Sequence, residues 1–125
     1  MSKNLRILLC DDNTVLRTAL VAALSFRGVD VLGDYDSFED LAEQFRQLRP
    51  DVVLVDINLP GISGTDGIRV MRSKGINVPV VAMSADIRNE PKAIAAGANG
   101  FFYKGSTDFA KLVDILRAAL AAAPV

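Results

Sequence analysis

LRILLCDDNT, residues 5–14, is an apolar run that stops at two adjacent aspartates, Asp11 and Asp12. A short apolar run without alternation is typical of a strand covered on both faces, as in a parallel sheet. Two neighbouring carboxylates repel each other, and a position at the end of a buried segment adds a desolvation cost. This placement is costly unless a cation or a reaction requires the two acids there.

Composition and charge indicate a globular domain and argue against several classes of protein. The chain has 125 residues, of which 50% are hydrophobic and 23% are charged. We therefore expect a single globular domain over residues 1–125. A net charge of −1 argues against direct binding of nucleic acid. The start, MSKNLR, is not followed by a signal-peptide pattern, and no apolar stretch approaches the roughly 20 residues that span a bilayer. We expect a cytoplasmic protein that contacts no membrane.

Cysteine and histidine usage removes several kinds of active site. The one cysteine, Cys10, allows no intrachain disulfide, and its apolar neighbours favour a buried, reduced thiol. The chain has no histidine. This excludes Ser-His-Asp and Cys-His triads, and it excludes the usual zinc sites.

Strand-like and helix-like segments alternate along the chain. The expected strands are residues 5–10, 29–35, 51–56, 78–83 and 100–104. Apolar residues at a 3.6-residue period predict helices from Val15 to Leu24, from Phe38 to Leu48, around Ile68 and Met71, around Ile94, and from Phe109 to Leu120. The expected ends of the first four helices are Gly28, Pro50, Gly75 and Gly97.

Local signals refine three of these helices. Ser37 and Asp40 resemble a capping box at the start of the second helix. Pro91 suits the first turn of the fourth helix, which we expect to have only about two turns. Ser106 or Thr107 is expected to cap the fifth helix.

Five strand–helix repeats predict an α/β fold, with an open parallel sheet covered by helices on both faces. In such sheets the functional site lies at the carboxyl ends of the strands. Polar residues stand at four of these ends: Asp11 with Asp12, Asp56, Ser84 and Lys104. We therefore expect three carboxylates, a hydroxyl and an ammonium to meet at one edge of the sheet.

A cluster of three carboxylates needs positive charge. Two unit charges 4 Å apart repel by about 4 kcal/mol at an effective dielectric constant of 20. A hard divalent cation with oxygen ligands, Mg²⁺ first, together with Lys104 would balance the cluster. The set then suits the receipt of a phosphoryl group by a carboxylate. Asp56 is the candidate nucleophile because it leads into an accessible glycine-rich loop, INLPGISGTDG (57–67). Asp11, Asp12 and the backbone carbonyl of Asn58 are candidate metal ligands.

Four segments in order resemble one known family: LLCDDN (8–13), VLVDINLPGISG (53–64), VVAMSA (80–85) and AGANGFFYKG (96–105). Over essentially its full length the chain resembles the receiver domain of two-component response regulators, of the chemotaxis-regulator type. The resemblance implies a flavodoxin-like (βα)5 fold with strand order 2-1-3-4-5.

The resemblance also implies a role for each site residue. Asp56 matches the phospho-acceptor, and Lys104 matches the lysine that contacts the phosphoryl group. Asp11, Asp12 and Asp56, with the Asn58 carbonyl, match the Mg²⁺ ligands. Ser84 and Phe101 occupy the positions of the two switch residues.

Receivers of this family take a phosphoryl group from a sensor histidine kinase or a histidine phosphotransfer protein, which supplies the histidine that this chain lacks. They catalyse only their own phosphorylation and dephosphorylation, so we expect a signalling domain rather than an enzyme. Phosphorylation is expected to change the surface of the fourth helix, fifth strand and fifth helix, and so to control a downstream protein or an attached output domain.

Three features depart from the family pattern. Gly105 replaces the common proline after the lysine, which is expected to loosen that loop. Phe101 lacks a hydroxyl, so a switch at this position would act by packing alone. The segment from Ser84 to Gly97 is short, which predicts a reduced fourth helix on the expected output surface.

Simpler interpretations exist for single residues. The Asp11–Asp12 pair, Asp12 or Asn13 could cap the first helix, Ser84 could cap the fourth, and Lys104 could be a solvated surface lysine.

Three other functions also compete. A phosphatase of the haloacid-dehalogenase type would need a second acid where Asn58 stands, and a nucleotide-binding loop would need the lysine that GISGTDG (61–67) lacks. A docking module without phosphorylation, part of a larger regulator or hybrid kinase, is the main alternative.

Overall fold

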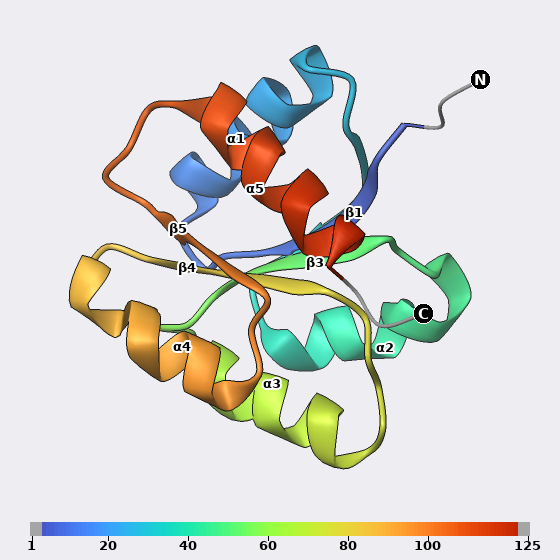
Figure 1. The fold of residues 1–125 in the computed structure, drawn as a ribbon. Coiled ribbons are helices and arrows are strands. Elements are labelled where there is room, and N and C mark those ends of the chain that lie inside the picture. The colour runs from blue at the N-terminus through green and yellow to red at the C-terminus, as the bar shows by residue number, and fades with distance from the viewer. Residues whose placement is uncertain (1–3, 123–125) are drawn as a thin grey trace.

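The computed structural model describes residues 4–122, in which strands and helices alternate (Figure 1). The strands are β1 (Arg6–Cys10), β2 (Asp30–Tyr35), β3 (Val52–Asp56), β4 (Val80–Ser84) and β5 (Gly100–Tyr103). The helices are α1 (Thr14–Phe26), α2 (Phe38–Leu48), α3 (Gly64–Ser73), α4 (Glu90–Ala96) and α5 (Phe109–Ala121), with a short 3₁₀ turn, η1 (Ile87–Asn89), before α4. The predicted alternation is confirmed. The predicted domain limits, residues 1 and 125, lie outside the described residues.

The strands form one parallel sheet in the order β2-β1-β3-β4-β5, as the family resemblance implied. The register pairs Cys10 with Val55, and it pairs Asp56 with Met83. Neighbouring strands therefore finish almost level with one another. The residues that follow β1 and β5 consequently stand beside the last residues of β3 and β4.

Helices cover both faces of the sheet (Figure 1). Side chains alternate along a strand, so Ile7 and Leu9 face one side while Leu8 and Cys10 face the other. Ile7 and Leu9 belong to a core with α1 and α5, and Leu8 and Cys10 belong to a core with α2, α3 and α4. Burial on both faces explains why the central strands read as unbroken apolar runs.

Most predicted helix ends agree with the structure, but the predicted cap of α5 is wrong. Asp108 caps α5, and its Oδ1 accepts from the backbone N–H of Lys111 at 2.9 Å. Ser106 is not available for this role, because its Oγ accepts from the backbone N–H of Asp108 at 3.1 Å in the preceding turn. At α2, Ser37 accepts from the N–H of Asp40 at 3.2 Å, as one half of a capping box would.

The fourth helix is short, as the sequence predicted. It has seven residues and ends at Gly97, whose φ of 116° lies in the left-handed region that favours glycine. Within residues 4–122, no helix combines the length and the apolar character needed to cross a membrane.

Cys10 lies in the core below the carboxyl edge of the sheet. The thiol is fully buried and unpaired, which confirms the prediction from its neighbours. Burial, together with the nearby charges of Asp11 and Asp56, raises its pKa to about 12. The folded protein therefore holds the proton of this thiol more tightly than the unfolded chain does.

This difference predicts a loss of stability in alkaline solution. The thiol ionises from its ordinary pKa of 9.0 in the unfolded chain and only near 12 in the folded protein. The native state then binds more protons, so the free energy of unfolding falls as pH rises above 9, by up to about 1.4 kcal/mol per pH unit. Urea unfolding of wild type and Cys10→Ala, from neutral pH to about pH 10.5, measures this term. The stability advantage of wild type should shrink above pH 9, and a constant difference would contradict the assignment.

Candidate functional site

Three carboxylates meet at the carboxyl edge of the sheet. Asp11 follows β1, Asp56 is the last residue of β3, and one carboxylate oxygen from each of Asp11, Asp12 and Asp56 lies within 4.8 Å of the others. Asp11 and Asp56 are buried, whereas Asp12 is exposed. The group is therefore open to solvent on the Asp12 side.

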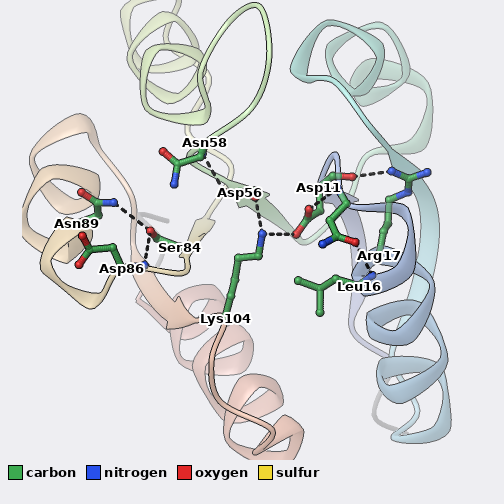
Figure 2. A network of polar contacts seen from close by, with 10 residues as sticks. Asp11, Leu16, Arg17, Asp56, Asn58, Ser84, Asp86, Asn89 and Lys104 are labelled. Atoms are coloured by element: carbon green, nitrogen blue, oxygen red, sulfur yellow. Dashed lines mark hydrogen bonds and ion pairs between the residues drawn. The ribbon is translucent and has the colours of Figure 1, made fainter.

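Lys104 joins the two buried acids (Figure 2). Its Nζ lies 2.6 Å from Oδ2 of Asp56 and 3.0 Å from Oδ2 of Asp11. The residue follows β5, and its backbone N–H donates to the carbonyl of Ser84 at 2.8 Å. This bond extends the pairing of β4 and β5 by one step and places the lysine side chain over the acids.

The two buried acids are held in the same way. Oδ1 of Asp11 accepts from the backbone N–H of Asn13, and Oδ1 of Asp56 accepts from that of Asn58, each at 2.8 Å. Such bonds to the amide two residues on are Asx turns, which fix the carboxylate relative to its own loop. Each acid thus has one oxygen bound to backbone and the other directed to Lys104.

Burial and charge act in opposite directions on this ion pair. Burial raises the pKa of Asp56, and the charge of Asp11 adds to the rise, while Lys104 and the Asn58 N–H only partly oppose it. Burial also disfavours the charged form of Lys104, but the bonds to Asp56 and Asp11 outweigh it and raise the lysine pKa. The lysine is therefore a firmly held ammonium beside a carboxyl group that is costly to ionise.

The cluster of three aspartates is suited to a divalent cation. Its three negative charges are balanced by only one lysine, and the side chains offer only oxygen ligands, which hard cations such as Mg²⁺ prefer. Oδ2 of Asp11 is buried, and apart from its ion pair with Lys104 it meets no hydrogen-bond donor within the described part of the chain. An oxygen with a free lone pair in an acidic pocket is what a metal ligand requires. The predicted metal role of the Asn58 carbonyl stays a prediction.

Ser84 stands at the same edge but faces another way. Its side chain is fully buried, and its Oγ accepts from the backbone N–H of Asp86 and from Nδ2 of Asn89, both at 3.0 Å. In Figure 2 the bonds of Ser84 run to the loop between β4 and α4, whereas those of Asp56 run to Lys104 and Asn58. The hydroxyl thus joins the site through its strand position and not through a bond to the acids.

Phe101 and Phe102 point to opposite faces of the sheet. Phe102 is buried in the core beneath α1 and α5, while Phe101 is half-buried against the core of the other face. The aromatic side chain at position 101 is therefore packed on one side and open to solvent on the other.

Of the simpler interpretations of single residues, the one for Asn13 is confirmed and the others do not hold. Asn13 caps α1, with Oδ1 accepting from the N–H of Leu16 at 3.1 Å, so the two aspartates before it are not the cap. Ser84 does not cap α4, because its Oγ serves the preceding loop. Lys104 is not a solvated surface residue, since its side chain is only 14% exposed.

Sequence reasoning missed two residues that hold the site loops. Arg17 on α1 donates to the carbonyl of Asp11 at 2.6 Å and pairs with Asp34 at 3.0 Å. Glu39 on α2 accepts from the backbone N–H of Ile62 at 3.2 Å and so ties the loop after Asp56 to a neighbouring helix. Neither residue stands at a strand end, so no local pattern marked it.

The model of the response regulator receiver domain family matches residues 7–117, and the chain belongs to this family. It is 33% identical over 121 residues to the response regulator GacA of Pseudomonas viridiflava, covering 94% of this chain and 56% of that protein. It is 30% identical over 101 residues to the chemotaxis protein CheY of Thermotoga maritima, covering 79% of this chain and 84% of that protein.

A solved structure supports the same assignment. The signal receiver domain of the response regulator NarL from Mycobacterium tuberculosis superposes with a TM-score of 0.83 at 30% identity, covering 94% of this chain and 98% of that one. The chain spans about half the length of the first curated relatives it matches.

The acidic group predicts that divalent cations stabilise the fold. A ligand that binds only the native state adds about 2.7 kcal/mol at a hundredfold excess over its Kd. Thermal unfolding with increasing MgCl₂ should therefore show a rising Tm for wild type and a much smaller rise for Asp11→Asn. The exposed Asp66→Asn, on α3, is the matched control and should respond like wild type. Equal rises in all three proteins would mean that the cation acts elsewhere.

Proposed function

We propose that this chain is a phospho-accepting receiver in which Asp56 takes a phosphoryl group from a phosphohistidine. The donor would be a sensor histidine kinase or a histidine phosphotransfer protein. The observation that carries the proposal is the contact of Lys104 with both Asp56 and Asp11, inside a group of three carboxylates. A lone structural aspartate would need neither a buried lysine nor two further acids.

The chemistry follows from these positions. A carboxylate oxygen of Asp56 forms a bond to phosphorus as the bond from phosphorus to the donor imidazole breaks. The imidazole keeps the electron pair and takes up a proton from water. The Lys104 ammonium, already 2.6 Å from the Asp56 carboxylate, is placed to attract the phosphoryl oxygens. Bound Mg²⁺ would supply the further positive charge that such transfers require.

Each remaining site residue has a proposed task. The side chains of Asp11, Asp12 and Asp56, with the carbonyl of Asn58, would hold Mg²⁺. The hydroxyl of Ser84 would donate to one phosphoryl oxygen. No further titrating residue is needed, because Asp56 attacks in its ionised form and the leaving imidazole is on the partner.

Phosphorylation would then act on the surface formed by α4, β5 and α5. The phosphoryl group adds about −1.5 to −2 charges beside Ser84 and Lys104. Movement of Ser84 would change the β4–α4 loop, and Phe101, half-buried in β5, would repack. A groove on this surface is lined by Ile87, Phe101, Tyr103 and Ile115, among others, and suits contact with a downstream protein or an attached output domain.

The same proposal covers the wider role of the chain. It would be a cytoplasmic signalling domain, would catalyse only its own phosphorylation and dephosphorylation, and would contact neither membrane nor nucleic acid directly. The competing function is a receiver-like docking module that takes no phosphate. The complete set of acids, serine and lysine favours the phospho-accepting form.

Phosphate uptake from acetyl phosphate tests the proposal directly. Wild type with MgCl₂ should gain the mass of one phosphoryl group, and the gain should disappear with excess chelator. Asp56→Asn keeps the shape of the side chain but removes the nucleophile, so it should gain no mass. Intact-mass spectrometry measures all three samples. Equal uptake by Asp56→Asn would remove Asp56 as the acceptor, and no uptake by wild type would favour the docking module.

A phosphoryl mimic tests the switch separately. Beryllofluoride with Mg²⁺ should bind at Asp56 and change the NMR shifts of Ser84 and Phe101, which lie on β4 and β5 beyond the acids themselves. Asp56→Asn, which cannot coordinate the mimic, serves as the control. Shift changes confined to residues 11, 12 and 56 would show binding without a switch.

A further inference from the structure

Asn89 makes a contact that the proposed chemistry does not use. Its side chain is half-buried, and Nδ2 donates to Oγ of Ser84 at 3.0 Å. The backbone N–H of Asp86 donates to the same oxygen at 3.0 Å. Both lone pairs of the hydroxyl oxygen are thus engaged by the β4–α4 loop, and Figure 2 shows this oxygen on the side of Asn89 and away from Asp56.

The hydrogen bond from Asn89 to Ser84 is unusual for a residue at the start of a helix. Asn89 is the residue before α4, where an asparagine side chain normally accepts a bond from the first helical turn. Here it makes no such bond, and its backbone is helical, with φ −79° and ψ −5°. The amide group serves Ser84 instead of its own helix, so the bond links the switch serine directly to the start of α4.

In the part of the chain that the structure describes, no other side chain of the β4–α4 loop makes a bond that could replace the one from Asn89 to Ser84. Asp86 bonds to Arg88, whose side chain is 87% exposed, and an exposed pair of this kind contributes little. The Asp86 N–H is backbone and moves with the loop. Within the described residues, Asn89 is therefore the side chain that donates a hydrogen bond to the Ser84 hydroxyl oxygen, beside the backbone N–H of Asp86.

We infer that Asn89 is a positioning residue for phosphoryl transfer, which holds the Ser84 hydroxyl turned away from Asp56. Ser84 reaches a phosphoryl oxygen only when its bond to Asn89 opens, and that opening also frees the first turn of α4. The inference rests on the proposed function, because it assumes that Ser84 serves the phosphoryl group. The inference goes beyond that function because it names the hydrogen bond, from Asn89 to Ser84, that opposes the turning of Ser84 towards the phosphoryl group.

Removing the donor tests the inference. Asn89→Leu keeps the size of the side chain, carries no charge and cannot donate. Since a hydrogen bond contributes a net of about 1 kcal/mol, the initial rate of phosphorylation by acetyl phosphate should rise roughly two- to tenfold. The Mg²⁺ affinity, measured from the Tm rise, should stay unchanged. The control is Glu90→Ala, which alters the exposed first turn of α4 without touching Ser84 and should leave the rate unchanged.

A double-mutant cycle separates positioning from general loosening. In the Ser84→Ala background, Asn89→Leu should have no effect on the rate. An equal gain in that background, an equal gain from Glu90→Ala, or no gain from Asn89→Leu would each overturn the inference.

A second measurement does not depend on phosphorylation. In the unphosphorylated protein, the side-chain amide resonances of Asn89 should shift on Ser84→Ala, and unchanged resonances would overturn the contact itself. A wild type that takes no phosphate would instead refute the proposed function, while this NMR result would still decide the contact.

Discussion

The ammonium of Lys104 between two buried carboxylates is the interaction on which this molecule depends. Its Nζ is 2.6 Å from Asp56 and 3.0 Å from Asp11, in a place where burial already makes ionised Asp56 costly. One positive charge cannot balance three acids. The site therefore keeps an excess of negative charge, which a divalent cation can balance. In the proposed function, that cation and Lys104 together would also attract the negatively charged phosphoryl group.

The parallel sheet makes such an arrangement possible at a position that water can reach. Neighbouring strands end level with each other, so the ends of β1, β3 and β5 bring the charged residues of the site to the same edge. The loops are then fixed by contacts from outside the strands. Arg17 holds the carbonyl of Asp11, and Glu39 holds the loop after Asp56. These bonds hold the site loops in place through backbone groups. They do not involve the carboxylate oxygens of the three site aspartates.

The residues of the site form two parts, and only one of them already has the contacts that the proposed function needs. The acids and Lys104 already contact one another, so this part is preorganised for binding charge. Ser84 is bound to Asn89 and Asp86 instead. In the proposed function, Ser84 would exchange these bonds for one to the phosphoryl group, and this exchange would couple events at Asp56 to the loop before α4. α4 has only seven residues, so few helical hydrogen bonds oppose its rearrangement.

The sequence by itself determined the strands, the helices and the residues at the strand ends. Burial on both faces leaves unbroken apolar runs, and helices keep a 3.6-residue period, so each element carries its own local signal. A local signal was misleading at α5, where Asp108 caps the helix because Ser106 is engaged one turn earlier. Only the tertiary structure decided the roles of Arg17, Glu39 and Asn89, and the direction of the Ser84 hydroxyl. Their partners are set by how strands and helices pack and by side-chain rotamers, and neither leaves a periodic trace along the chain.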